Sequence, residues 1–294
     1  MIVSKSHANY FLLFALLTIL LPACKQEQPK KVTRRMQQQQ IKGFTPKNKI
    51  VQPAVAKRNP KTLTMAELQI AKEYSEALDN KAQTIVYLEN MVKQCSDPVL
   101  LKDIYLELAD LYFEQGSMDL AAQLYSSYIA LYPGSPLRAY VHYQAILCKY
   151  YTTFSHDRDQ TKTEETLKLT QLYNELASKQ GDIYKEYYND VASIQKQCCK
   201  KMYAHELDVF NFYYKKGNYK AAQVHLDEMK RIYLGLLNEE VEPDLLALEC
   251  NVATRLGDSK TAVTKQAELE AKYPHQATLK LASNNPKTDH VTRF

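Results

Sequence analysis

The sequence predicts an all-α protein, a superhelical solenoid built from about five helical hairpins. Three observations predict this fold class. Only 7 of the 294 residues are glycine and 11 are proline. No stretch after Thr62 alternates polar and apolar residues as a strand would, and apolar residues recur instead at intervals of three and four, as in residues 101–112. Because one hairpin cannot bury its apolar face alone, the hairpins are expected to stack on one another.

The N-terminus has the features of an export signal. Lys5 precedes an unbroken apolar run of twelve residues at 10–21. A membrane-spanning helix needs about 20 residues, so this run suits the core of a signal peptide instead. It ends in Leu21-Pro22-Ala23-Cys24, which resembles the lipobox of bacterial lipoproteins. That resemblance implies a signal peptide at 1–23 and acylation of Cys24 by fatty acids such as palmitate. It also implies that Lys25 favours sorting to the outer membrane. The alternative is an ordinary signal peptide followed by an incidental cysteine.

Charge is divided unevenly along the chain. Between Lys25 and Lys61 there are eleven Lys or Arg residues and one acid, a net charge of +10, whereas the chain from Thr62 onward has a net charge of −6. Residues 24–62 are predicted to be a basic, disordered tether, because they hold too few apolar residues to offset the entropy of ordering. Its r.m.s. reach is on the order of 30–35 Å, and its charge suits anionic lipid headgroups. Nucleic-acid binding is the other use of such a run, and export argues against it.

The repeat domain is expected to span residues 63–274, followed by a disordered tail at 275–294 that lacks periodicity. Asp97-Pro98 and Ser135-Pro136 each place a capping side chain before a proline, the residue that suits the first turn of a helix. The pattern predicts ten helices in five antiparallel pairs, at 63–78, 81–94, 98–115, 118–132, 136–152, 161–179, 183–215, 218–236, 242–256 and 258–273.

The glycines mark equivalent turns. Gly116, Gly217 and Gly257 are each followed five residues later by an alanine, at 121, 222 and 262. This pattern resembles the tetratricopeptide repeat, a helix–turn–helix unit of 34 residues. In a weaker copy, Asp79-Asn80 replaces the glycine. From Gly116 to Gly217 is 101 residues, almost three periods, yet this interval shows only one clear helix pair and then one unusually long helix.

The sequence contains no motif of a catalytic or cofactor site. It lacks G-x-S-x-G, H-E-x-x-H, a P-loop and G-x-G-x-x-G. His205 adjoins Glu206, and His225 lies three residues before Glu228, a spacing that could ligate a metal. Solvated helix faces often carry such pairs, so no metal site, cofactor or enzyme activity is predicted; a cysteine- or metal-dependent enzyme is the remote alternative. The acids of Asp157-Arg158-Asp159 are expected to cap and link helices through pairs with arginine.

Cysteine and tyrosine usage add two expectations. Beyond Cys24, none of the cysteines has zinc-ligand spacing, and all are expected to be small buried residues on helices: Cys95, Cys148, Cys198, Cys199 and Cys250. There are 22 tyrosines and no tryptophan, with doublets at 150–151, 187–188 and 213–214. One narrow stripe of a helix cannot bury both members of a doublet, so either one member is partly exposed for binding, or helices buried on two sides absorb both.

Three segments are more specific than the generic repeat. They are 128–133 with the following 140–143, then His156–Gln160, and finally His205–Val209 running into Gly217. With the lipobox and the tether, these segments resemble the BamD family, lipoproteins of the outer-membrane β-barrel assembly machinery, over roughly residues 63–275. Tyr128 stands where that family typically has arginine, and Gln160 stands where it has proline.

The resemblance implies a scaffold without catalysis at the periplasmic face of the outer membrane. Its partners would be the periplasmic domains of BamA, other lipoproteins of the assembly machinery and unfolded β-barrel proteins. Residues 63–133 would offer a groove for an extended substrate segment, and 183–273 would dock BamA. Lys215 and Lys216 are the candidates for pairing with an acidic partner site; the alternative is that they only stabilise a helix C-terminus. A tetratricopeptide lipoprotein that scaffolds cell-wall or other envelope complexes is the alternative function.

Overall fold

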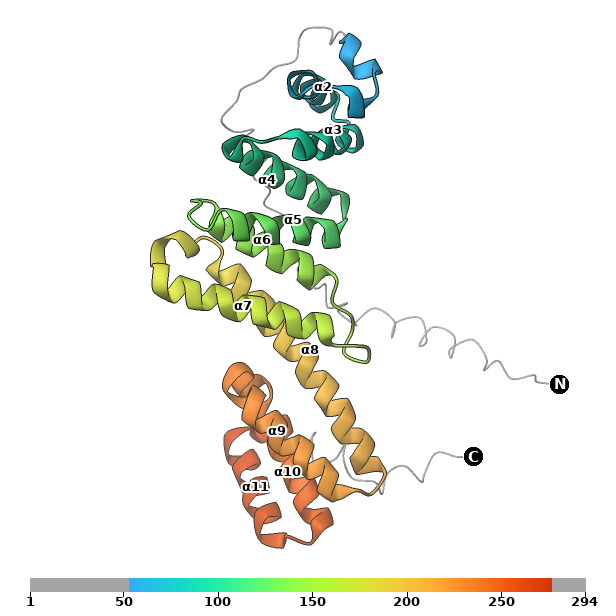
Figure 1. Ribbon diagram of the computed structural model, residues 1–294. Helices are drawn as coiled ribbons and strands as arrows, with labels where there is room; N and C mark the ends of the chain where they lie inside the picture. The colour runs from blue at the N-terminus through green and yellow to red at the C-terminus, as the bar shows by residue number, and fades with distance from the viewer. Residues whose placement is uncertain (1–52, 277–294) are drawn as a thin grey trace, which may run out of the picture. The chain divides into compact units, whose positions relative to one another are not determined.

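The computed structural model of the chain describes residues 53–276, and Figure 1 shows the arrangement of their helices. The chain divides into two units, 1–44 and 45–294, and the described residues all belong to the second. The predicted signal peptide, the anchor at Cys24, most of the predicted tether and the residues from 277 onward lie outside the described residues. Of the segment predicted as a tether, residues 54–57 and 60–62 form two short 3₁₀ helices, η1 and η2, and Val55 packs against the first core.

The predicted all-α solenoid of tetratricopeptide-like hairpins is confirmed. Residues 53–276 contain no strand, and each α-helix packs against the one that follows it in sequence. The helices are α2 Met65–Ala77, α3 Lys81–Gln94, α4 Pro98–Gln115, α5 Met118–Leu131, α6 Arg138–Tyr151, α7 Thr161–Gln180, α8 Tyr188–Lys215, α9 Tyr219–Leu237, α10 Glu242–Leu256 and α11 Ser259–Lys272. None of these described helices has both the length and the apolar content that crossing a membrane requires.

Four turns between paired helices share one hydrogen-bond pattern. Gly116, Gly217 and Gly257 have φ values of 87°, 75° and 80°, and Asp79, at 52°, occupies the same position in the first hairpin. In every case the next residue donates its backbone N–H to a carbonyl five residues back, the bond of a Schellman turn. The weaker repeat copy at Asp79-Asn80 is therefore a true equivalent of the three glycine turns.

Five helix starts lie one to five residues later than predicted, at α2, α6, α8, α9 and α11. The long helix begins at Tyr188 rather than at 183, because Gly181–Tyr184 form a 3₁₀ turn (η3) whose Tyr184 is buried and accepts a hydrogen bond through its carbonyl from Tyr173 at 3.0 Å. Helix α6 begins at Arg138 rather than at 136. The Ser135 hydroxyl accepts a hydrogen bond from Leu137 N at 3.2 Å, just ahead of the helix. It also lies 2.8 Å from the hydroxyl of Tyr128, which gives the oversized tyrosine of this repeat a polar partner.

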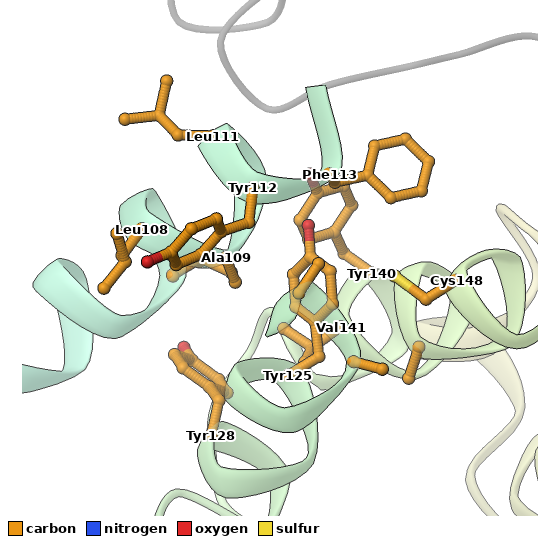
Figure 2. Packing of buried hydrophobic residues seen from close by; sticks show 14 of the residues in the cluster. Leu108, Ala109, Leu111, Tyr112, Phe113, Tyr125, Tyr128, Tyr140, Val141 and Cys148 are labelled. Atoms are coloured by element: carbon orange, nitrogen blue, oxygen red, sulfur yellow. The ribbon is translucent and has the colours of Figure 1, made fainter. Parts of the chain in front are cut away.

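The buried apolar residues form two main clusters that meet inside α8. The first cluster runs from Leu63 to Cys198 and includes the residues of α4, α5 and α6 in Figure 2. The second runs from Cys199 to Val252. Leu167 of α7 packs against both clusters. Helix α8 is therefore the element that joins the two halves of the repeat stack.

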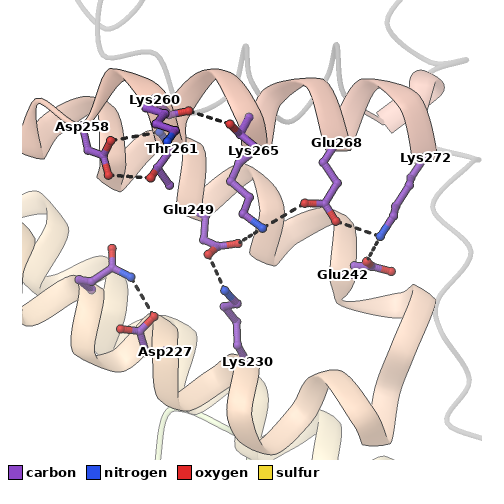
Figure 3. Close-up of polar contacts among 12 residues, drawn as sticks. Asp227, Lys230, Glu242, Glu249, Asp258, Lys260, Thr261, Lys265, Glu268 and Lys272 are labelled. Atoms are coloured by element: carbon purple, nitrogen blue, oxygen red, sulfur yellow. Dashed lines mark hydrogen bonds and ion pairs between the residues drawn. The ribbon is translucent and has the colours of Figure 1, made fainter.

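The last described helix, α11, combines a small apolar contact with several ion pairs: Leu269 packs against Leu246 and Ala247 of α10. Only Ala262 and Leu269 of α11 are buried. A ladder of alternating charges binds α11 to α10 and α10 to α9: Glu249 contacts Lys230 and Lys265, Lys265 and Lys272 contact Glu268, and Lys272 also contacts Glu242 (Figure 3). Tyr273 extends the ladder by donating to Glu242 at 2.7 Å.

The cysteines within the described residues are free thiols. Cys148, Cys198, Cys199 and Cys250 are buried on helices, as predicted, while Cys95 follows the end of α3 and is half-buried. Burial raises the pKa of both Cys148 and Cys198 to about 12. These two thiols are therefore packing groups with little thiolate character.

Candidate partner-binding surface

Lys215 and Lys216 lie at the C-terminal end of α8. Lys215 is the last helical residue and Lys216 is the C-cap. Both are exposed, and neither forms an ion pair with any residue from 53 to 276. The Nζ atom of Lys216 lies 5.9 Å from the centre of the Phe212 ring, within the range of a cation–π contact. The two lysines thus present unneutralised charge at a helix C-terminus, beside an aromatic ring that is 57% exposed.

Aromatic rings of α8 and α9 pack together at this end of α8. Phe210 is buried and stacks on Tyr214 at a centroid distance of 5.7 Å. Tyr214 meets Tyr219 of α9 edge to face at 5.3 Å, and Tyr213 stacks on His225 of α9 at 5.3 Å. Both members of the 213–214 doublet are therefore half-buried between two helices. The rings fix the helix end that carries the lysines.

The other tyrosine doublets divide differently. Tyr187 is buried while Tyr188 is 46% exposed, and Tyr150 is buried while Tyr151 is half-buried. Every doublet therefore has at least one partly exposed member, as one of the two alternatives predicted. Tyr188 presents the most exposed ring of the six.

The two histidine–glutamate pairs of the sequence do not form a metal site. His225 lies 3.3 Å from Glu206 of α8, while Glu228 accepts a hydrogen bond from Arg231 at 2.9 Å. His205 donates from Nδ1 to the carbonyl of His156 at 2.8 Å. Across residues 53–276, no group of three or more His, Cys, Asp or Glu side chains is placed to hold a metal ion.

The Asp157-Arg158-Asp159 segment lies in the loop between α6 and α7. Asp159 accepts hydrogen bonds from both Thr161 N and Thr161 Oγ1, at 3.2 and 2.8 Å, so it binds the first residue of α7, while the N-cap position is Gln160. The predicted arginine–carboxylate pair is not formed. Arg158 lies instead over the ring of Phe154, with Cζ 4.4 Å from the ring centre.

A mostly apolar groove of about 190 Å³ lies over α6, between α5 and α7. Its walls include Ile129, Leu169 and Leu172, and its polar groups include His142 and Lys149. Burial, and then the charge of Arg138, lower the pKa of His142, which favours the neutral imidazole. Lys149 is bound by Glu165 at 2.8 Å. Only α5 of this groove belongs to the segment 63–133 in which a substrate groove was predicted.

The N-terminal hairpins contain two buried polar clusters that sequence reasoning missed. Lys72 of α2 donates to both carboxylate oxygens of Glu107 of α4 at 2.9 Å, and to Glu76 at 3.4 Å. Deeper in the core, Asp110 accepts hydrogen bonds from the hydroxyls of Tyr125 and Tyr140 at 2.7 and 2.8 Å. The only sequence signal for the second cluster is an acid within the apolar run at 108–113.

The similarity of this chain to known proteins lies at the level of its family. A family model named YfiO and described as an outer membrane lipoprotein matches residues 66–269, which is more than half of the chain. A search of curated proteins gave no match. Among solved structures, BtubC (BKLC) from P. vanneervenii is 14% identical, with 78% of this chain and 85% of that chain covered and a TM-score of 0.23. The family match spans the helices from α2 to α11, and the chain belongs to the YfiO family of outer membrane lipoproteins.

Proposed function

We propose that this chain is a lipid-anchored scaffold of the outer-membrane β-barrel assembly machinery, as BamD is. In this role it binds BamA and unfolded β-barrel proteins at the periplasmic face of the outer membrane, without catalysing a reaction. Membership of the YfiO family carries the proposal. The three specific segments of the sequence and the stack of tetratricopeptide-like hairpins support it, since repeat stacks bind proteins through extended surfaces.

The anchor is Cys24, exposed by removal of the signal peptide at 1–23. The basic segment that follows Cys24 then connects the acylated cysteine to the repeat domain. Cys24→Ser removes the thiol that receives the acyl chain. Labelling of cells with radioactive palmitate should mark the wild-type chain and not this variant; equal labelling of the two would disprove the anchor.

BamA docks at the C-terminal hairpins, with Lys215 and Lys216 opposite an acidic site. The observation behind this placement is that both lysines are exposed and carry no ion pair within the described residues. Exposed charges of this kind steer association and set orientation more than they add affinity. The lysines also lie at the negative end of the α8 dipole, which favours their charge. Their ammonium groups remain accessible to a partner, since both side chains are exposed.

Unfolded barrel segments bind the N-terminal hairpins, and the groove between α5 and α7 extends that surface. Its apolar walls suit aliphatic or aromatic side chains of an extended segment, while the main-chain groups of that segment stay hydrated. Binding without bond chemistry is the expected mode of action.

An affinity purification of the acylated full chain from its own envelope tests the function. BamA and companion lipoproteins of the assembly machinery should be recovered in stoichiometric amounts. Recovery of peptidoglycan enzymes without BamA would disprove the proposal and favour the alternative, a lipoprotein that scaffolds cell-wall complexes.

A further inference from the structure

The loop between α6 and α7 is bound along one face of the long helix. Lys201 Nζ donates to Thr153 Oγ1 at 2.6 Å, and His156 Nδ1 donates to Asp208 Oδ2 at 2.9 Å. Between them, His205 binds the carbonyl of His156. These three helix positions, 201, 205 and 208, are spaced by four and three residues and so lie on one face of α8. The loop is a fixed part of that face.

The same face continues to the candidate docking residues. Continuing the spacing of four and three from Asp208 leads to Phe212 and Lys215. Eight residues separate Asp208 from Lys216, a distance of roughly 12 Å along a helix at 1.5 Å per residue. One short segment of a partner protein can therefore touch both the loop and the end of α8.

The polar groups on this face differ in their contacts. Each carboxylate of the loop and its contact accepts a hydrogen bond: Asp157 from Ser155, Asp159 from Thr161, and Asp208 from His156. Within residues 53–276, Arg158, Lys215 and Lys216 form no ion pair. Phe154 and Phe212, 38% and 57% exposed, each lie beneath one of these cations.

We propose that the loop of residues 152–160 is the second half of the docking surface at the end of α8. Phe154 with Arg158, and Phe212 with Lys216, form two aromatic–cation contacts that receive one acidic protein segment. This inference rests on the proposed function and adds to it a second contact region and the partner's chemistry. Arginine and aromatic side chains are the types that dominate protein interfaces. An anionic lipid surface carries the same charge as an acidic protein segment, and the experiment below distinguishes the two.

Photo-crosslinking in the cell envelope tests the inference with the full acylated chain. A photoreactive phenylalanine analogue replaces Asp157 in one strain and Lys215 in another; both positions are exposed. Both positions should capture the same protein, at a segment rich in Asp and Glu. Arg158→Glu should lower the capture at position 215 about tenfold, since reversing one interface charge both removes an attraction and adds a repulsion. Lys179→Glu, an exposed charge reversal near the C-terminal end of α7 and outside both proposed binding segments, is the matched control and should leave the capture unchanged.

The outcomes separate the two proposals. Capture of one acidic segment of a protein other than BamA would support the two-part surface and overturn the proposed function. Capture of BamA from position 215 but not from position 157 would overturn the two-part surface and support the proposed function. The inference also fails if position 157 captures phospholipid or nothing, or if Arg158→Glu has no more effect than Lys179→Glu.

Discussion

Cys198 and Cys199 are neighbours on α8, yet Cys198 packs into the first apolar core and Cys199 into the second. Adjacent helical residues point about 100° apart, so one helix can serve two cores at one position. The boundary between the two halves of the repeat stack is therefore a single peptide bond in the middle of a continuous helix.

Removing either sulfur should loosen a different half of the protein. Cys198→Ala and Cys199→Ala each leave a small cavity and should each lower the free energy of unfolding by about 1 kcal/mol. Hydrogen exchange should rise in α6 and α7 for the first variant, and in α9 and α10 for the second. Faster exchange in the same helices for both variants would show that the two cores unfold as one unit.

Glu76 should make the protein less stable as pH rises through neutrality. Burial, and then the hydrogen bond to Glu107 and repulsion from it, raise the pKa of Glu76 from 4.5 to about 7. Between these values the native chain keeps a proton that the unfolded chain has lost, so the free energy of unfolding falls as pH increases. Glu76→Gln should match the wild type near pH 5. It should be roughly 1–2 kcal/mol more stable near pH 8, after discounting for a side chain that is 30% exposed.

Denaturant titrations at the two pH values measure this difference. Glu73→Gln is the matched control, because Glu73 is exposed on the same helix and contacts Gln69 rather than Lys72 or Glu107. A Glu76→Gln effect of equal size at both pH values would contradict the prediction.

The glycine turns should tolerate a side chain poorly for a purely backbone reason. At Gly116, φ is 87° and nothing lies within 4 Å of an added Cβ, so Gly116→Ala meets no clash. The left-handed conformation alone should cost about 1–2 kcal/mol in the free energy of unfolding. Gly134→Ala, at a site with the same empty surroundings and no positive φ, should be neutral or slightly stabilising. Equal thermal stabilities of the two variants would refute this reasoning.

Asp110 should couple three helices. Tyr125 of α5 and Tyr140 of α6 donate to the same carboxylate oxygen of this α4 residue. Tyr125→Phe and Tyr140→Phe should each lower the free energy of unfolding by about 1–2 kcal/mol, since each removes a hydrogen bond to a buried charged group. The double variant should lose more than the sum, and a double-mutant cycle measures the excess. Strict additivity would mean that the two bonds act independently.

Local chemistry made the helices and their turns predictable. Asp97 accepts from Val99 N at 2.9 Å ahead of Pro98, as the sequence indicated, and the equivalence of Gly116, Gly217 and Gly257 was visible from their spacing. These features depend on residues within one or two turns of each other. The fold class followed because every helix packs against its sequence neighbour.

Features that depend on distant partners were not predictable. His156 and Asp208 are 52 residues apart, and nothing in their local sequence indicates that they meet. The helix predicted from residue 183 begins only at Tyr188, because Tyr184 is buried beneath α7, where its ring lies 4.9 Å from that of Tyr173. The candidate surface was therefore predicted at Lys215 and Lys216, while its aromatic supports and the loop beside it required the folded chain.

The charge ladder on α11 bears on how a stack of repeats ends. Any helical hairpin that covers the previous one also offers a template for the next, so a stack with an apolar final face would join copies end to end into fibres. Here the last described helix, α11, is joined to α10 through Lys265–Glu249 and Lys272–Glu242, and its remaining surface is largely polar. A polar outer face on a terminal repeat disfavours such polymerisation, which matters for chains concentrated on a two-dimensional surface.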